Sequence, residues 1–392
     1  MSTVITGYAR TPTGKYGGTL ASQRAVELGG VAIAAALDRS GVDPGAVDEI
    51  LMGQVLQAGE GQITSRQAAV RAGLPMTIPA TTINKVCLSG SAAIALADRG
   101  IRAGDVTFAV AGGMESMSNA PHVLRDLRWG VRLGDSVAVD TMQHDGLFCA
   151  FDQCTMGESS DRNNQKLGIG REEQDEWAAR SQQRAHEATR SGRFADEIAP
   201  VEVPQRKGDP VTVDTDEGIR PDTTPESLAG LRAAFVDDGT ITAGNASQIS
   251  DGAAALVLAD RKAAESAGLP ILGELVSYGQ LGGGDATLHE RPAEAIRLAL
   301  KNADLDPSDL DLVEINEAFA AVALWSAQML DLSPDKVNVN GGAIALGHPL
   351  GASGARVVVT LVAELRRRGG GIGAAALCGG GGQGDALIVR VK

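Results

Sequence analysis

An internal repeat constrains the fold of this 392-residue chain more than any other feature of its sequence. Residues 36–53 align without a gap with residues 299–316, at an offset of 263, and both segments contain an Asp-Pro pair at the same place. Each segment has the pattern of an amphipathic helix that ends, a turn, and a short apolar strand. The sequence therefore predicts two copies of one α/β unit, with chance similarity between two α/β segments as the alternative.

The repeat continues beyond these two segments. The Ser-Gly pair at 89–90 recurs at 353–354, and each pair opens an Ala/Val-rich helical run. Each run is followed by an apolar strand that ends in glycines, at 107–113 and at 373–382. Glycine makes up 50 of 392 residues, about 13% against a usual ~7%, which favours tight turns and close backbone approaches. If the copies pair about a pseudo-twofold axis, their equivalent loops meet at one crevice.

A segment of different character, residues 118–250, separates the two copies. Within it, residues 171–190 predict a solvent-exposed helix that is acidic at its start and basic at its end, as the helix dipole favours. Long insertions of this kind are usually functional. We therefore expect an N-terminal core (1–117, first repeat), a loop or covering domain with a return to the core (118–250), and a C-terminal core (251–392, second repeat).

The composition excludes several classes of function. The formal net charge is −14 and the pI about 4.9, which argues against binding to nucleic acid or to anionic membranes; an anionic ligand needs a local cationic pocket. The sequence shows no apolar run of ~18 residues and no leader-like segment. Four cysteines without a C-x-x-C pair favour reduced thiols. We expect a cytoplasmic protein that requires no metal, since no two histidines have metal-ligand spacing.

Cys87, in NKVCLSGSAA, is the first candidate catalytic residue. It follows a β-type run and precedes a helical run, so it is predicted to lie at a strand-to-helix turn. The N–H groups and the dipole of a helix start lower a thiol pKa and favour the thiolate nucleophile. The alternative is a buried structural cysteine.

His348 and Cys378 lie in glycine-rich segments of the second copy. The position of His348 near the repeated Ser-Gly pair places it at the same crevice as Cys87 if the copies pair. The glycines at 379–384 match G-x-G-x-x-G, but a strand-like segment follows where a dinucleotide site requires a helix. They are better explained as allowing a substrate to approach the backbone closely, or as donors of N–H groups to an oxyanion. Cys378 alone would be taken as a core thiol.

Asn316, in EINEAFA, directly follows the predicted strand of the second repeat. Its amide can orient a water or bind a carbonyl, or it can cap a helix that begins at Glu317. Two cysteines, one histidine and one amide at loop tips together indicate acyl transfer by a thiol nucleophile with a second acid or base.

These segments together resemble the thiolase family over essentially the whole chain. The motifs that carry the resemblance are NKVCLSGSAA (84–93), GGMESMSNAP (112–121), ITAGNASQISDGAAA (241–255), EINEAFAA (314–321), NVNGGAIALGHPLGASGAR (338–356) and CGGGGQG (378–384). The resemblance implies an α/β thiolase fold, with two pseudo-repeated core domains that have mixed five-stranded sheets. It also implies an inserted loop domain that covers coenzyme A.

The resemblance also implies roles for the candidate residues. Cys87 would become acylated after activation by His348, and Cys378 would exchange the α-proton of the second acyl-CoA. Asn316 would hold a water in one oxyanion hole with His348, and the N–H groups of Cys87 and Gly380 would form the other. The residues implied in binding coenzyme A and the acyl group are Met156, Arg220, Ser227, Leu231, Phe235, Ser247, Ala318 and Phe319.

Some positions depart from the pattern of the short-chain thiolases that the chain resembles. Thr155 stands where these proteins have a histidine before Met156-Gly157, Gln383 stands where many have methionine, and LHERPAEAI (288–296) replaces a loop with a Gly-Pro pair. Two activities therefore stay open. One is the condensation of two acetyl-CoA and its thiolytic reverse, and the other is degradative 3-ketoacyl-CoA thiolysis of broader chain length.

Two alternatives come from other classes. A ketoacyl-synthase-like enzyme would have His or Asn in place of Cys378, and a non-catalytic lipid-binding protein would have lost Cys87 or His348. The resemblance further implies a role in fatty acid and lipid metabolism, no tightly bound cofactor, coenzyme A as substrate and product, and a homo-oligomer (dimer or tetramer).

Overall fold

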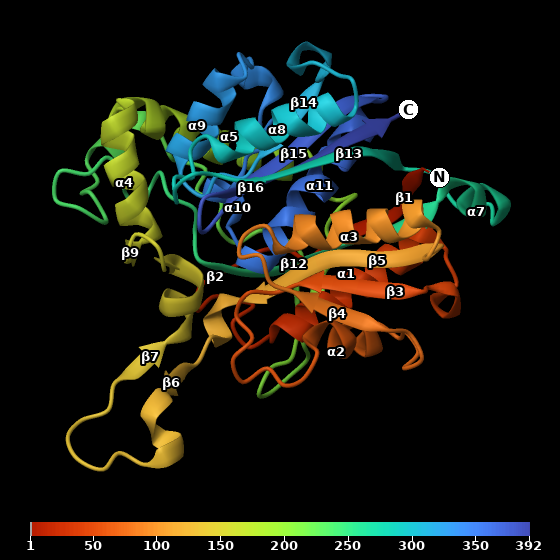
Figure 1. Ribbon diagram of the computed structural model, residues 1–392, viewed down its shortest axis with the longest axis horizontal. Helices are drawn as coiled ribbons and strands as arrows, with labels where there is room; N and C mark the ends of the chain where they lie inside the picture. The colour runs from red at the N-terminus through yellow and green to blue at the C-terminus, as the bar shows by residue number, and fades with distance from the viewer. Residues whose placement is uncertain (1) are drawn as a thin grey trace.

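The computed structural model describes residues 2–392 and consists of five layers in the order helix, sheet, helix, sheet, helix (Figure 1). The central layer contains α3 (Ser89–Ala103) and α11 (Leu350–Arg367), whose apolar residues form one core with both sheets. The outer layers contain α1 (Ala25–Ser40) and α2 (Thr64–Arg71) on one side, and α8 (Arg291–Asn302) and α9 (Ala320–Met329) on the other.

The first half of the molecule has a mixed five-stranded sheet. The strands, in spatial order, are β4 (Ala80–Ile83), β3 (Glu49–Gly53), β5 (Phe108–Ser116), β12 (Ser250–Asp260) and β1 (Thr3–Arg10). β3 is parallel to β4 and β5, whereas β12 is antiparallel to β5 and β1. β12 is buried along nearly its whole length because helices cover both faces of this sheet.

The second half repeats this order. Its strands are β14 (Leu312–Ile315), β15 (Gly371–Gly379), β16 (Gln383–Val391) and β13 (Gly273–Gly282), with the same pattern of parallel and antiparallel pairs. A parallel bridge between Val313 and Val337 takes the place of the fifth strand. The two sheets join where β1 pairs with β13. The predicted two-copy thiolase fold is therefore confirmed, with the addition that the two sheets are continuous.

The crossing of α3 and α11 confirms the predicted pseudo-twofold pairing. A Cβ atom added at Gly90 would lie 2.6 Å from the backbone nitrogen of Ala355, and one added at Gly354 would overlap that of Ser91. The two contacts are equivalent under the repeat. Both glycines are required because the helix backbones touch here, and this contact places the starts of the two helices side by side.

The predicted C-terminal core, residues 251–392, begins too early. Strand β12, residues 250–260, lies between β5 and β1 and completes the sheet of the first half. The second half begins only at β13, after the short helix α7 (Arg261–Ser266). An apolar strand carries no local signal of which sheet it joins, so the pairing had to come from the tertiary structure.

The insertion contributes further helices and strands, which pack against both halves. They are β6 (His122–Leu124), β7 (Ala138–Asp140), β8 (Phe148–Cys149), β9 (Cys154–Thr155), α4 (Met156–Leu167), α5 (Arg171–Arg190), β10 (Val201–Val203), β11 (Val211–Val213) and α6 (Pro225–Ala229). The remaining short elements are β2 (Gly14–Lys15) and α10 (Ala343–Leu346). None of the helices within residues 2–392 is long and apolar enough to cross a membrane.

Helix α5 has the predicted bounds, but the prediction that it is solvent-exposed is wrong. One face is buried against the second half, where Trp177 Nε1 donates to Glu317 Oε1 at 2.9 Å and Ser181 Oγ donates to Glu317 Oε2 at 2.7 Å. The buried face is largely polar and small, so its sequence shows no apolar stripe. Side chains of the core that accept hydrogen bonds from this face replace the water it would otherwise contact.

Candidate active site

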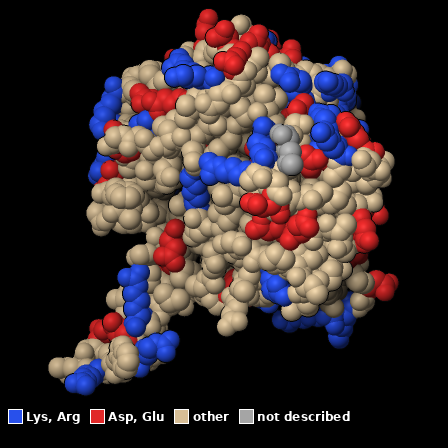
Figure 2. Space-filling model, turned by 45° about the vertical axis from the view of Figure 1, so that its right-hand side comes forward, with Lys and Arg blue, Asp and Glu red and all other residues tan. Residues whose placement is uncertain are grey.

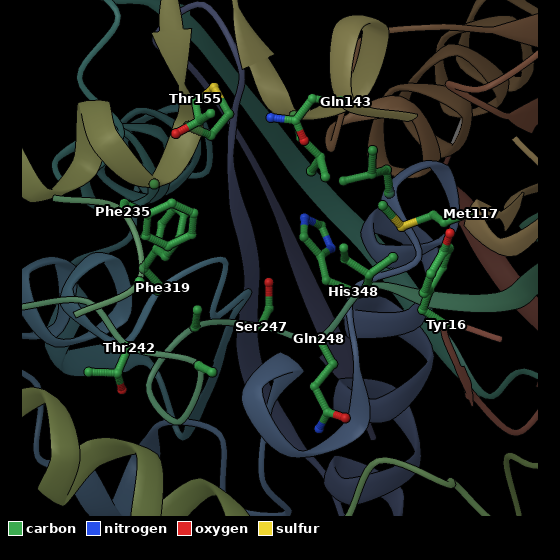
Figure 3. A pocket seen from close by; sticks show the side chains of 18 of the residues that line it. Tyr16, Met117, Gln143, Thr155, Phe235, Thr242, Ser247, Gln248, Phe319 and His348 are labelled. Carbon is green, nitrogen blue, oxygen red and sulfur yellow. The ribbon is translucent and has the colours of Figure 1, made fainter. Parts of the chain in front are cut away.

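Two adjoining cavities lie between the halves and the insertion. The larger, which we call the cleft, has a volume of about 490 Å³, and the smaller, the inner cavity, about 60 Å³. They share the lining residues Leu147, Met156, Ser247, Phe319, His348 and Leu350. In Figure 3, Phe235 and Phe319 form one wall of the cleft and Tyr16 and Met117 the opposite wall, with Ser247 and His348 between them.

Cys87 lies in the turn between β4 and α3, as predicted, and lines the inner cavity. The preceding residue, Val86, has a φ of +50°, a left-handed conformation that is strained for a β-branched side chain. Asn84 Oδ1 accepts from Val86 N–H at 3.0 Å, and Ser89 Oγ donates to the Val86 carbonyl at 2.6 Å. These hydrogen bonds stabilise the strained turn, which directs the Cys87 thiol toward the inner cavity.

The expectation that the helix start lowers the pKa of Cys87 is wrong. Cys87 is partly buried against the apolar side chains of Val55, Leu56, Met117 and Leu350, and this desolvation raises its pKa to about 11. The N–H groups of Gly380 and of Cys87 itself donate to the sulfur and act in the opposite direction, but desolvation is the larger effect. The resting Cys87 is therefore a neutral thiol at neutral pH.

Cys378 lies near the end of β15 and is 1% exposed. It lines the inner cavity together with Cys87 and Gly380. Burial raises the pKa of Cys378, and the neighbouring Cys87 raises it further. The inner cavity that surrounds this thiol is lined mainly by apolar side chains.

His348 lies two residues before α11, is buried, and lines both cavities; Figure 3 shows its ring at the cleft. Its Nδ1 lies 2.6 Å from Ser353 Oγ, and Ser353 Oγ donates to the Pro349 carbonyl at 3.0 Å. Because the hydroxyl has a single hydrogen, it accepts from Nδ1–H, and Nε2 is left as the free base. Burial, and secondarily the charge of Arg356, lowers the pKa of His348 to about 3. The resting imidazole is neutral and able to take a proton.

Asn316 is fully buried behind His348, and its Nδ2 lies 3.4 Å from both ring nitrogens. It does not cap a helix from Glu317, since α9 begins at Ala320 with Phe319 as its N-cap. Its Oδ1 accepts no hydrogen bond from any residue within 2–392. A buried carbonyl oxygen normally has a partner, so the geometry is compatible with the water-holding role that the resemblance implies.

The structure brings most of the predicted binding residues to these cavities. Met156, Arg220, Phe235, Ser247 and Phe319 line the cleft, and Ala318 lines the inner cavity. A Cβ on Gly157 would overlap the Phe235 ring, which explains the glycine after Met156. Ser227 and Leu231 line neither cavity: the Ser227 hydroxyl takes part in the capping box of α6.

The sequence analysis missed several residues that line the cleft. Lys15 is a second cation that lines the cleft, in addition to Arg220. Tyr16, Gln143 and Gln248 add polar groups. Lys15 and Tyr16 lie at β2, whose pairing with β12 places them at the cleft. Short polar stretches of this kind have no periodicity that would have singled them out. No three His, Cys, Asp or Glu side chains of residues 2–392 are grouped so as to hold a metal ion.

Comparison with known proteins agrees with this geometry. The model of the thiolase N-terminal domain matches residues 3–262, and that of the thiolase C-terminal domain matches residues 269–391. This fold and these two cavities define a member of the thiolase class, and the chain belongs to the thiolase family.

Particular relatives match over nearly their full length. A probable acetyl-CoA acetyltransferase of Mycolicibacterium smegmatis is 53% identical over 99% of this chain and 100% of its own. The acetyl-CoA acetyltransferase of Cupriavidus necator is 51% identical over 99% of both chains. The crystal structure of the Bacillus anthracis acetyl-CoA acetyltransferase superposes with a TM-score of 0.97 at 42% identity, over 100% of this chain and 99% of that one. Human mitochondrial 3-ketoacyl-CoA thiolase has a TM-score of 0.96 at 41% identity, with the same coverage.

Proposed function

We propose that this protein is an acetyl-CoA acetyltransferase, which condenses two acetyl-CoA to acetoacetyl-CoA and free CoA and catalyses the reverse thiolysis. The observation that carries the proposal is the convergence of two thiols and one neutral imidazole on one small cavity: Cys87, Cys378 and His348. The similarity to several acetyl-CoA acetyltransferases at about 50% identity supports the same activity.

The first half-reaction makes an acyl-enzyme. Cys87 Sγ attacks the thioester carbonyl of acetyl-CoA while its proton passes to His348 Nε2, and the N–H groups of Cys87 and Gly380 stabilise the tetrahedral oxyanion. The carbon–sulfur bond to CoA then breaks, and the same proton leaves with CoA as its thiol. Because the thiol and the imidazole both rest in their neutral forms, charge develops only when the substrate is present.

The second half-reaction forms the carbon–carbon bond. The thiol proton of Cys378 passes to His348 Nε2, and the resulting thiolate removes an α-proton from the second acetyl-CoA; the enolate is stabilised by the protonated His348 and by a water held at Asn316. The enolate carbon attacks the acetyl-Cys87 carbonyl, and the bond to Cys87 Sγ breaks. The proton held on His348 then passes to the Cys87 sulfur, while Cys378 keeps the α-proton, so both thiols and the neutral imidazole are restored.

The size of the inner cavity favours a short acyl group. Its volume of about 60 Å³ is bounded by the apolar side chains of Leu147, Leu288, Ala318, Phe319 and Leu350. Leu288 belongs to the segment that departs from the short-chain thiolase pattern, and it closes this cavity. The broader degradative thiolase is therefore the weaker alternative. The cleft, with Arg220 and Lys15 among its lining residues, suits the long anionic CoA moiety.

We also propose that the reaction needs no bound cofactor or metal, that CoA and acyl-CoA are its only small-molecule partners, and that the enzyme acts in cytoplasmic lipid and fatty acid metabolism. Full activity after dialysis against a chelator is the expected result, and loss of activity that added divalent metal restores would contradict it. Subcellular fractionation of the native host tests the location, and enzyme in the membrane or exported fraction would contradict it.

A projecting arm, residues 122–140, supports a homo-oligomer (Figures 1 and 2). Leu133 is 97%, Trp129 86% and Val137 75% exposed at its end, and apolar side chains this exposed mark interaction surfaces. Analytical ultracentrifugation should give a dimer or tetramer. A Trp129→Ser, Leu133→Ser double variant should dissociate at least one interface, and a monomeric wild type would overturn the proposal.

The activity itself is tested with acetoacetyl-CoA and CoA, by following the loss of enolate absorbance. We expect rapid thiolysis of the four-carbon substrate and slower thiolysis of 3-ketoacyl-CoA with six or more carbons. The Cys87→Ser variant is the control, since an alcohol is a far weaker nucleophile at neutral pH. Faster turnover of long chains would favour the degradative alternative, and no turnover at any length would indicate a non-catalytic protein.

A further inference from the structure

A buried ion pair connects the turn that holds Cys87 to the hairpin that holds Cys378. Lys85 Nζ lies 2.7 Å from Asp385 Oδ1, with Lys85 20% exposed and Asp385 fully buried. Asp385 Oδ2 accepts from Ser91 Oγ at 3.1 Å, in the first turn of α3. Neither Lys85 nor Asp385 lines the cleft or the inner cavity. The pair is therefore close to the site without touching the substrate.

The two partners are adjacent in sequence to the catalytic groups. Lys85 precedes the strained Val86 and is two residues before Cys87. Asp385 follows Gly384, which is the cross-strand partner of Cys378 in the β15–β16 hairpin. A displacement of the Lys85 turn relative to this hairpin would change the distance from Cys87 to Cys378 and to the N–H donors.

Few other polar contacts hold the turn to the second half. The hydrogen bonds of Asn84 and Val86 stay within the turn or reach the first half, at Val55. Apart from the Gly380 N–H that donates to the Cys87 sulfur, the Lys85 side chain makes the only hydrogen bonds from residues 84–87 to the second half, within the described chain. These go to Asp385, Gln280 and Tyr278.

The energetics fit a role in position rather than in overall stability. A buried ion pair contributes little net stability, because desolvation of both charges offsets their attraction. It is nevertheless directional when hydrogen bonds fix its geometry, and a strained turn persists only where its surroundings determine it. We infer that the Lys85–Asp385 pair is a positioning device that holds Cys87 at its working distance from Gly380 and Cys378. The inference rests on the proposed acetyl transfer and concerns residues outside the catalytic set.

The test is a comparison of Asp385→Asn and Lys85→Gln with wild type in thiolysis of acetoacetyl-CoA. We expect kcat to fall between ten-fold and about 10²-fold, the cost of a small misplacement of reacting groups, with KM for CoA within about two-fold because the cleft is unchanged. Lys85→Gln keeps a donor for the buried carboxylate, so it provides a folded variant should Asp385→Asn fail to fold. Combining the two substitutions should cost less than the sum of the separate losses.

Asp98→Asn is the matched control. It breaks the Asp98–Arg102 pair within α3, the helix that follows the Cys87 turn, at a place away from that turn. If Lys85→Gln keeps kcat within two-fold of this control while its melting temperature falls, the pair is only structural and the inference is overturned. An inactive wild type would instead contradict the proposed function. Active wild type with unaffected variants contradicts this inference alone.

Discussion

The two halves of the molecule have the same framework but supply different chemistry. The nucleophile candidate Cys87 comes from the first half, whereas His348, Cys378 and Asn316 come from the second. The strand registers show which residues of the first half occupy the positions equivalent to Asn316 and Cys378. Gly53 at the end of β3 corresponds to Asn316, and Met114 on β5 corresponds to Cys378. Neither of these first-half residues can move a proton at neutral pH.

The first half uses the residue after the position equivalent to Cys378 for structural support. Glu115, the residue after Met114, is buried and accepts hydrogen bonds from the N–H groups of Val55, Leu56 and Gly351, at 3.0, 3.1 and 2.9 Å. Gly351 lies in the first turn of α11, next to His348. One copy of the repeat therefore positions the helix start of the other copy, where the catalytic candidate His348 lies. The two copies have equivalent helix starts, but the side chains around these helix starts differ between the copies.

The largest expected effect separates the contributions of the two halves. Cys378→Ala should leave acetylation of Cys87 by acetyl-CoA detectable by mass spectrometry. Exchange of the acetyl methyl protons with deuterated water, read by NMR, should fall by about 10²–10⁴-fold, the range for general acid–base catalysis. His348→Ala should impair both steps, since it serves the thiol and an oxyanion. If Cys378→Ala blocks acetylation as completely as Cys87→Ser, the halves do not divide the reaction in this way.

The next effect concerns the desolvation of Cys87 in the turn between β4 and α3. Because burial raises the pKa of Cys87 to about 11, its thiolate fraction increases only as pH rises toward that value. Alkylation of the Cys87 peptide by iodoacetamide at pH 7 should be about ten- to hundred-fold slower than that of free cysteine. The rate should keep rising up to pH 10, as measured by peptide mass spectrometry. A plateau below pH 8 would show that the helix start dominates after all.

The symmetry of the helix crossing predicts similar stability losses in both halves. Gly90→Ala and Gly354→Ala each insert a methyl group between touching backbones, and each should lower the free energy of unfolding by about 1–3 kcal/mol. Gly284→Ala, where an added Cβ meets no atom within 4 Å, is the control for chemical denaturation. A loss at only one of the two crossing glycines would contradict the pseudo-twofold contact.

The smallest effect is expected for the two cations that line the cleft, which lie outside the segments that the two copies share. Arg220→Ala and Lys15→Ala should each raise KM for CoA several-fold, with kcat largely unchanged, because binding is lost equally in the ground and transition states. The effect should weaken at high salt. Arg206→Ala, an exposed cation that does not line the cleft, is the control. An unchanged KM in both variants would place the nucleotide end of CoA elsewhere.

Much of this arrangement was predictable from the sequence. The repeat at an offset of 263 indicated two α/β units, and the bounds of α5 and the strand-to-helix turn at Cys87 followed from local pattern. The pairing of the two units was predictable as well, since the Ser-Gly pairs marked the helix starts. The helices and turns depend on residues within a few turns of one another, where periodicity and turn chemistry act, whereas the pairing follows from the equivalence of the two copies.

Only the tertiary structure decided the features that depend on distant segments. The place of β12 in the first sheet, the burial of α5, and the presence of Lys15 at the cleft each require chain segments far apart in sequence to meet. The same is true of the raised pKa of Cys87, since its desolvation comes from apolar residues of both halves. A local sequence pattern predicts the secondary structure that a residue adopts with its neighbours in the chain. Burial is the sum of what the whole chain packs around it, and it sets how a thiol or an imidazole titrates.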